Sequence, residues 1–443
     1  MKKRWIMLLS LVSALILTAT GAFASGGGLF SFFNKEPETV TITKEEYDYL
    51  RRFEKLAEIY EWIDLYYIEA PDQERLLESA IWGMFEGLGD VYSFYYDPDS
   101  WQAMREDDEG NYAGVGIQML GNYNDNTVTI QRVFKNSPAE KIGIRKGDLL
   151  IRVDDLTVNA ETMSEAANLM RGKEADTVEL EVVRRGENIV FTVPRAQINV
   201  NWIETTMLED QVGLLTLYEF SGDCVEGFAN GLKELEDAGA TALIVDLRDN
   251  GGGWVEDAKQ IADIFLDRQM LFYSEDRYGE RSEEYTTDGK DDIPLVFLVN
   301  EGSASSSEIL AGSLQDAGRA KLVGTQTYGK GIMQYVIPLS GLNGRDDGMQ
   351  VTCAQYFMPS GKKVHKIGIT PDVVVEMPEE LVGEYLELDD MTDPQLAAAW
   401  EAALQLRDDI PVAAAAPSVE EPETTGAELD FAAFEDQIVW TIG

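Results

Sequence analysis

The sequence has one histidine, His365, and two cysteines, Cys224 and Cys353, among its 443 residues. His365 lies in the basic run Lys362–Lys366, which we interpret as an exposed surface hairpin. A serine enzyme built on this chain would therefore use lysine as its base. Two cysteines are too few for a disulfide framework, and the apolar neighbours of both favour buried, unbridged thiols.

Basic residues are also scarce, with 36 lysines and arginines against 80 aspartates and glutamates and a formal net charge of −44. Such a surface repels phosphate backbones, which argues against nucleic-acid binding. We interpret acidic pairs such as Asp107-Asp108 as solvated loops. The length and a hydrophobic fraction of 44% allow two or three domains, each with its own core.

The first 24 residues have the features of an export signal. Lys2–Arg4 precede an apolar stretch, Trp5–Ala24, which ends in the A-x-A sequence Ala22–Ala24. The stretch is also nearly as long as a membrane-spanning helix, which needs roughly 20 apolar residues. Cleavage and retention as an N-terminal membrane anchor are both open. Either way, we expect an extracytoplasmic protein of the cell envelope, secreted or anchored to the membrane.

Helical and strand-rich patterns follow one another after this segment. Apolar residues recur at helical spacing from Thr43 to about Met104, which predicts a helical module that ends at the aromatic run Tyr92–Tyr96. We expect it to provide packing or dimer surfaces and to have no chemical role. Residues 112–195 then change to short strands with one helix near Glu161–Met170.

Two motifs characterise this strand-rich region. Gly114–Ile117 opens it and Ser137–Asp148 lies in its middle, and their order resembles that of a PDZ domain. In such domains a peptide adds a strand to the sheet edge and a loop holds its terminal carboxylate. The resemblance places four residues in that loop: Gly114, Val115, Gly116 and Ile117. Arg171, just after the predicted helix, would contact the carboxylate or switch the domain's position, unless it only complements the helix dipole.

Beyond residue 200, two apolar strands each lead into an unusual turn. Ala242–Leu247 is followed by the glycine-rich Arg248–Gly253, and Pro294–Val299 by the serine-rich Asn300–Glu308. Apolar strands alternating with helices predict an α/β sheet covered on both faces. Ligands gather at the carboxyl ends of such strands, so we expect the two turns along one sheet edge. At this edge, the backbone N–H of a glycine in the first turn and that of the residue after a serine in the second could together hold an oxyanion.

A lysine between two glycines, in Tyr328–Gly331, is the candidate base. Free lysine titrates near 10.4, so a base at neutral pH needs burial to lower its pKa by about three units. Flanking glycines would let Lys330 lie close under the backbone. The pattern Ser305-x-x-Glu308 also fits a structural capping box. Composition does not decide which serine of the turn attacks: Ser303, Ser305, Ser306 or Ser307.

The motifs together resemble the catalytic core of the carboxyl-terminal processing (tail-specific) proteases, over roughly residues 45–378. The matching stretches are Asp246–Gly253, Asn300–Glu308, Ala311–Asp316, Tyr328–Gly331, Gln334 and Gly368–Asp372. In that family the serine precedes the lysine by 25 positions, which selects Ser305 for Lys330, and Gln334 completes the triad. The resemblance also implies oxyanion donors at Gly252 and Ser306. Gly251 stands where the family has proline, which makes the loop less rigid.

The resemblance implies an α/β, multi-domain fold in which a ClpP/crotonase-like protease core carries an inserted PDZ domain and helical N- and C-terminal segments. It implies no metal or organic cofactor. The predicted segments are a signal peptide or anchor (1–24), a tether (25–42), an N-terminal helical region (43–108), a PDZ-like domain (112–195), a Ser/Lys protease core (200–378), and a C-terminal helix, acidic linker and tail (379–443).

The predicted function is that of an exported serine endopeptidase, which cleaves proteins near their free C-termini and uses its PDZ-like domain for tail recognition or gating. We expect a homodimer and a regulatory protein partner. One alternative is a peptide-binding adaptor in which the core is only a scaffold. Another is a Ser/Lys amidase, but such enzymes use Ser-x-x-Lys, and the turn at 303–308 lacks it.

Overall fold

The computed structural model describes residues 41–122, 125–289, 291–339, 346–378, 381, 386, 388–409 and 439–441. It divides into two units, Met1–Ala80 and Ile81–Gly443. The predicted signal peptide or anchor, nearly all of the tether and the linker after residue 409 lie outside the described residues. Within the part that is described, no helix is both long and apolar enough to cross a bilayer.

The first unit consists of helices that bury none of their side chains. They are α2 (Lys44–Leu50), η2 (Arg51–Phe53), α3 (Glu54–Tyr66) and the start of α4 (Gln73–Glu86). Thr43 and Glu46 form a capping box at the start of α2. The large apolar side chains that remain exposed include Tyr49, Phe53, Leu56, Ile59, Trp62 and Leu65.

In the second unit, a small β domain has a hydrophobic core of its own, built around Ile130, Leu150 and Leu180. Its antiparallel sheet has the order β3 (Ile117–Asn122), β4 (Thr127–Val133), β5 (Leu149–Val153), β7 (Thr177–Arg184), β8 (Glu187–Pro194), and β6 (Leu156–Thr157) pairs with β5. Two short helices accompany it, α6 (Pro138–Ile142) and α7 (Met163–Met170). The chain enters and leaves this domain through an antiparallel ribbon, β2 (Asn111–Gly114) with β9 (Ala196–Asn199).

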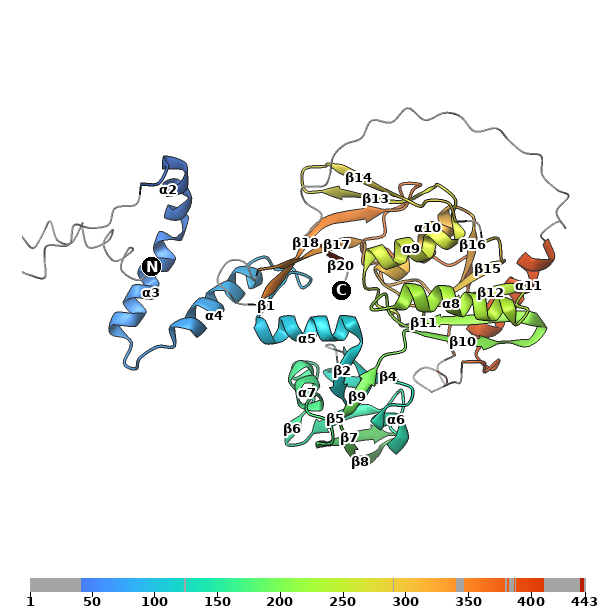
Figure 1. Cartoon of the computed structure of the whole chain (residues 1–443), viewed down its shortest axis with the longest axis horizontal. Coiled ribbons are helices and arrows are strands. Elements are labelled where there is room, and N and C mark those ends of the chain that lie inside the picture. Colours follow the sequence, from blue (N-terminus) through green and yellow to red (C-terminus); the bar gives the residue numbers. More distant parts are fainter. Residues whose placement is uncertain are drawn as a thin grey trace, which may run out of the picture. The chain divides into compact units, whose positions relative to one another are not determined.

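A mainly parallel sheet forms the centre of the second unit (Figure 1). Its order is β10 (Ile203–Met207), β11 (Val212–Leu217), β12 (Ala242–Asp246), β15 (Leu295–Val299), β16 (Ala320–Gly324), β19 (Val373–Val374), with only β10 antiparallel to its neighbour. Every residue of β12 and β15 is buried. β15 is apolar throughout and β12 is apolar up to Asp246 at its end, because helices cover both faces of the sheet.

The two faces of this sheet have separate hydrophobic clusters. On one face lie α8 (Cys224–Asp237), α9 (Val255–Phe265) and α10 (Ser306–Asp316), and on the other lies α11 (Pro394–Asp409). The alternation of strand and helix thus produces the α/β core that the sequence predicts. Neither cysteine is bridged, as expected; Cys224 is buried as predicted, but Cys353 is only half-buried.

A second sheet brings distant parts of the chain together. Its order is β14 (Arg281–Tyr285), β13 (Met270–Asp276), β18 (Gly348–Phe357), β17 (Ile332–Pro338), β20 (Val439–Thr441). Strand β1 (Phe94–Tyr96), which precedes the small β domain and is followed by α5 (Pro98–Glu109), also pairs with β18. A segment from the N-terminal side of the inserted domain is therefore built into the core.

Candidate active site

The glycine-rich and serine-rich turns lie side by side, as their positions after β12 and β15 predict. These strands are parallel neighbours, with Asp246 opposite Leu298. The N–H of Asp249 donates to Oδ1 of Asn300 (2.9 Å), and the N–H of Ala304 donates to the carbonyl of Asn250 (3.0 Å). Main-chain and side-chain hydrogen bonds thus join the two turns into one rim at the carboxyl edge of the sheet.

Three of the four serines hold this rim together. Their hydroxyls donate to carbonyls of the glycine-rich segment: Ser303 to Leu247 (2.7 Å), Ser306 to Gly253 (2.8 Å) and Ser307 to Asn250 (2.9 Å). A hydroxyl has one proton to donate. A serine that donates this proton to a carbonyl of the neighbouring turn has a structural role, which makes Ser303, Ser306 and Ser307 weaker candidates for the nucleophile.

Ser305 has a backbone conformation that side chains rarely adopt. It is fully buried at the start of α10, with φ 61° and ψ −118°. Such conformations persist only where the surroundings impose them, and they cluster at functional sites. A Cβ atom added to Gly252 would lie 2.6 Å from the Cβ of Ser305, so only glycine lets the preceding turn pack against this side chain.

Glu308 connects the serine turn to the lysine loop. Its Oε2 accepts the backbone N–H groups of Ser305 (2.9 Å) and Lys330 (2.8 Å). Its Oε1 accepts the N–H of Gly329 (2.8 Å) and the hydroxyl of Thr327 (2.5 Å). Burial raises the pKa of this carboxyl, although the four donors oppose the shift. The capping pattern indicates the bond to Ser305, but nothing in it indicates the contacts with the lysine loop.

Lys330 is buried, with 5% of its surface exposed. A Cβ at Gly331 would lie 2.2 Å from the backbone nitrogen of His365, so the glycine permits the close packing that the sequence predicts. Burial lowers the pKa of Lys330 to about 8, while the charges of Asp90 and Glu308 raise it. The direction of the shift is that required of a lysine base.

Two tyrosines that the sequence analysis missed complete the surroundings. The hydroxyl of the fully buried Tyr356 lies within hydrogen-bond distance of the carbonyls of Ser305 (3.3 Å) and Lys330 (3.0 Å). The Nζ of Lys330 lies 4.7 Å from the ring centroid of Tyr92. The aromatic run Tyr92–Tyr96, in which the sequence showed no sign of chemistry, lies beside the lysine because β1 pairs with β18.

Gln334 lies on β17, four residues after Lys330, beside a bulge in the pairing with β18. It is fully buried. Its Nε2 donates to Oγ1 of Thr352 (3.1 Å), and its Oε1 is buried without a hydrogen-bond partner. A buried acceptor of this kind suits a donor such as an amine, and its desolvation is costly if it stays unpaired.

The predicted oxyanion donors have different surroundings. Ser306 is the first residue of α10, where the helix dipole favours negative charge. The N–H of Gly252 donates to Oδ1 of Asn250 (2.9 Å), and its carbonyl accepts from the N–H of Phe220 (2.8 Å). Donation by Gly252 to a substrate therefore requires the Asn250 side chain to share or release this N–H.

His365 is half-buried rather than exposed on a surface hairpin. Its backbone packs on Gly331, and its Nδ1 is buried without a hydrogen-bond partner. Burial and the neighbouring Lys366 and Lys363 lower the pKa of the imidazole. A local basic run could not predict this position, which results from packing against the lysine loop.

The predicted peptide-binding residues open the small β domain. Val115 and Ile117 belong to its core, and Gly116 has φ +84° and lies so close to Ser137 that a Cβ would clash. Arg171 lies at the end of α7, with its guanidinium 5.2 Å from the ring centroid of Tyr112. The loop geometry is thus defined, while peptide binding stays a prediction.

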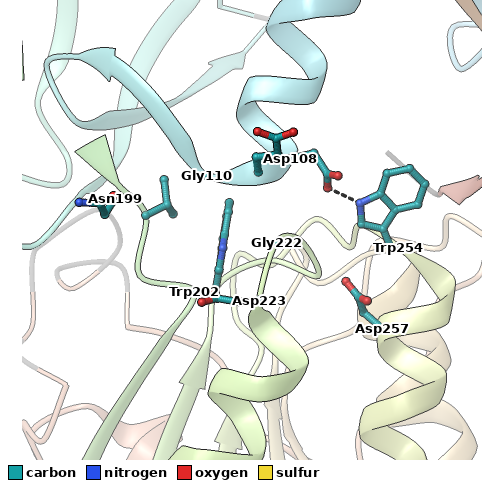
Figure 2. A pocket seen from close by; sticks show the side chains of 10 residues that line it. Asp108, Gly110, Asn199, Trp202, Gly222, Asp223, Trp254 and Asp257 are labelled. Carbon is teal, nitrogen blue, oxygen red and sulfur yellow. Dashed lines mark hydrogen bonds between the residues drawn. The ribbon is translucent and has the colours of Figure 1, made fainter. Parts of the chain in front are cut away.

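A pocket of about 540 Å³ lies where the chain enters and leaves this domain, lined by Gly110, Asn199 and Trp202 among others (Figure 2). Asp108, at the end of α5, accepts hydrogen bonds from the indole of Trp254 and from Ser221 (2.7 Å). The interpretation of this acidic pair as a solvated loop is therefore wrong for Asp108. The pocket does not include the serine or the lysine; it belongs to the attachment of the ribbon.

An α/β core with an inserted PDZ-like domain, a strained buried serine and a buried lysine defines a serine peptidase. Residues 211–375 match the model of Peptidase family S41, residues 129–184 match a PDZ domain, and residues 15–100 match the Activating protease CtpB N-terminal domain. The chain belongs to peptidase family S41, among the carboxy-terminal processing proteases.

Named relatives support this assignment. The carboxyl-terminal-processing protease of Picosynechococcus sp. is 35% identical over 334 residues, which are 74% of this chain and 79% of that protein. The carboxy-terminal-processing protease of Bartonella bacilliformis is 31% identical over 350 residues, or 77% and 79%. A solved photosystem II D1 C-terminal processing protease shares 26% identity and a TM-score of 0.54, covering 77% of this chain and 96% of that chain. The predicted fold class is confirmed.

Proposed function

We propose that this chain is an exported endopeptidase that cleaves proteins near their carboxyl ends, with Ser305 as nucleophile and Lys330 as general base. The observation that carries the proposal is a buried amine of lowered pKa on a loop whose backbone shares the Glu308 carboxylate with the candidate serine. Gln334 would orient the amine through its buried Oε1. The mechanism needs no metal or organic cofactor.

In this mechanism the neutral amine of Lys330 removes the proton of the Ser305 hydroxyl as Oγ attacks the carbonyl carbon of the scissile peptide bond. The resulting ammonium gives its proton to the departing amine. Water then attacks the acyl-enzyme ester, with the same lysine as base, and restores the serine. At pH 7, a pKa of about 8 leaves about one lysine in ten neutral and ready to act.

The oxyanion of each intermediate would be held by the N–H groups of Gly252 and Ser306. For Gly252 this requires the Asn250 amide to move aside or share the N–H. The absence of side chains at Gly251 and Gly253, and the lack of the proline usual at 251 in the family, favour such a movement. Losing one donor of this kind typically costs about 100- to 1000-fold in rate.

The PDZ-like domain would capture a substrate tail, or gate access to the serine, through Gly114–Ile117 and Arg171. Contacts with the glycine turn support a gate. Gln131 donates to the carbonyl of Asp249 (3.0 Å), and Nζ of Lys146 lies 3.2 Å from its Oδ2. Asp249 precedes Gly252 by three residues, so displacement of the domain would shift the backbone of the proposed oxyanion donor.

Export rests on the N-terminal sequence pattern, and the segment boundaries predicted above remain our proposal. The exposed apolar side chains of α2 to α4 suit a homodimer interface, because contiguous apolar surface of this kind marks interaction sites. We retain a regulatory protein partner, and anchoring to the membrane by the N-terminal segment, as further parts of this proposal.

The test uses an unfolded protein and a defined tail peptide, with products read by mass spectrometry. We expect the wild type to cleave near the carboxyl end and the Ser305→Ala and Lys330→Met variants to lose cleavage by at least about a thousandfold, as for other essential nucleophiles and bases. Retained turnover by either variant would refute the proposed mechanism. Tail binding by the wild type without any cleavage would support an adaptor instead.

A further inference from the structure

The segment Asp90–Ser93 lies about twenty residues before the inserted PDZ-like domain in the chain, yet it is built into the surroundings of Lys330. Strand β1 follows it directly and pairs with β18, with Phe94 opposite Gln350. The side chain of Gln350 donates to the carbonyl of Tyr92 (3.1 Å). The position of Tyr92 is therefore fixed by the same strand that pairs with β17, which carries Gln334.

Tyr92 covers the amine of Lys330 with the face of its ring, 4.7 Å away at the centroid. Its hydroxyl lies 3.4 Å from that of Tyr328, and burial is the main cause that raises the pKa of Tyr92 well above its ordinary value. The ring is therefore neutral at every pH at which the enzyme would work. The ring shields the amine from water, and burial is the largest cause that lowers the pKa of Lys330, although an aromatic face also attracts an ammonium.

Asp90 begins a chain of hydrogen bonds that leads to Gln334. Its carboxylate accepts a hydrogen bond from the hydroxyl of Ser93 (2.5 Å), and Oγ of Ser93 accepts one from the backbone N–H of Thr352 (2.9 Å). Oγ1 of Thr352 in turn accepts Nε2 of Gln334 (3.1 Å). Because the amide nitrogen is used here, the oxygen of Gln334 is left on the other side of the amide as an acceptor.

We propose that Asp90, Tyr92 and Ser93 are positioning residues of the lysine base, so that the catalytic centre is assembled from chain on both sides of the inserted PDZ-like domain. This inference rests on the proposed Ser/Lys function. Tyr92 provides the dry cover of the amine. The negative charge of Asp90 favours the ammonium form and so opposes the effect of Tyr92. Ser93 and Thr352 link the carboxylate of Asp90 to the amide of Gln334 through hydrogen bonds.

Among the residues that the structure describes, the carboxylates that raise the pKa of Lys330 are Asp90, from the segment before β1, and Glu308, from α10. The other titratable groups near the lysine loop are Tyr92, Tyr328, Tyr356 and His365, with Lys363 and Lys366 beside the imidazole. Glu308 accepts four hydrogen bonds that hold the loop. Asp90 accepts fewer bonds, and its replacement by asparagine removes the charge while keeping an oxygen that can accept the hydroxyl of Ser93.

The test is the pH profile of kcat/KM for the full-length enzyme on a tail peptide, whose acid limb reports the free lysine. For Asp90→Asn we expect the acid limb to move down by about one pH unit, since an opposite charge has been removed, and activity at pH 7 to rise up to about fivefold. Asp97→Asn is the matched control, because Asp97, just after β1, accepts hydrogen bonds from Ser100 and is not among the charges that raise the pKa of Lys330. An unmoved acid limb, or an equal shift in the control, would overturn the inference.

The cover is tested by Tyr92→Ala against Tyr92→Phe. The alanine variant admits water, so we expect its acid limb to move to higher pH, while phenylalanine keeps the ring and leaves the limb in place. Equal shifts in both variants would show that the hydroxyl, not the cover, matters. A change in thermal stability alone, without a moved limb, would reduce the segment to a structural role.

A readout independent of activity separates this inference from the proposed function. In the Ser305→Ala background, acetylation of Lys330 by acetic anhydride across a pH series, read by mass spectrometry, titrates the amine directly, with the exposed Lys363 as reference. Adding Asp90→Asn should make Lys330 reactive at lower pH. If this shift appears while Ser305→Ala still cleaves, the positioning network stands and the serine mechanism falls.

Discussion

The serine turn and the glycine turn follow neighbouring parallel strands, but they are held in different ways. The serine turn is fixed from inside the core, where Glu308 and Tyr356 tie the backbone of Ser305 to that of Lys330. The glycine turn has few side chains of its own. Besides its hydrogen bonds to the serine turn, the glycine turn contacts the PDZ-like domain through Asp249.

This difference separates two requirements of the chemistry. The nucleophile and base need a fixed distance and a dry environment, which buried hydrogen bonds provide. The proposed oxyanion donor, Gly252, needs a backbone that can approach the substrate, and its N–H would have to be released from or shared with Asn250. The absence of side chains at Gly251, Gly252 and Gly253 allows such adjustment, and contact with the PDZ-like domain offers a way to control it.

The largest effect should come from Glu308→Ala. The substitution leaves four buried donors without their acceptor, so the free energy of unfolding should fall by at least about 3 kcal/mol and cleavage should be lost. Glu301→Ala is the matched control in the same turn, since Glu301 is exposed and accepts a single bond from Thr325. Chemical denaturation and peptide cleavage measure both, and equal behaviour of the two variants would contradict a central role for Glu308.

Gly252→Ala should have the next largest effect. Its Cβ would lie 2.6 Å from that of Ser305 at a φ of +111°, so we expect kcat to fall by about 100-fold or more. Gly251→Ala is the control, because its Cβ meets nothing within 4 Å. Steady-state kinetics should show a loss in kcat with KM nearly unchanged for the first variant only. A normal kcat in Gly252→Ala would show that this turn is not part of the oxyanion site.

Lys146→Ala should have the smallest effect and tests the contact between the PDZ-like domain and the glycine turn. The ion pair with Asp249 is half exposed, so stability should change by less than about 1 kcal/mol. If the contact gates the site, basal cleavage of a substrate without a recognisable tail should rise a few-fold. Lys141→Ala, on α6 of the same domain, should leave it unchanged. If basal cleavage rises in neither variant, or rises equally in both, the contact between Lys146 and Asp249 is not a gate.

Much of the fold could be predicted from local patterns. The strands 242–247 and 294–299 are largely apolar because both faces of the sheet are covered, and their order along the chain placed the two turns at one edge. Glycines on both sides of Lys330 correctly indicated close backbone packing. These features depend on residues near one another in sequence, which is why pattern alone was sufficient.

The missing parts of the site come from segments far apart in the chain. Tyr92 reaches Lys330 only because β1 pairs with β18, and His365 is half-buried only because its backbone packs on Gly331. The local sequence around Asp108 indicated a solvated acid, but the fold places Ser221 and the indole of Trp254 beside its carboxylate. No local spacing encodes such contacts.

By itself the sequence determined the residue types that the chemistry requires: a serine at a helix start, a lysine between glycines, and glycines after a buried strand. Tertiary structure decided which serine hydroxyls donate to neighbouring carbonyls and how far burial lowers the pKa of the lysine. The reason is physical. Hydrogen-bond partners and desolvation depend on what lies within a few ångströms in space, and around this site such neighbours are up to 259 residues apart in the chain.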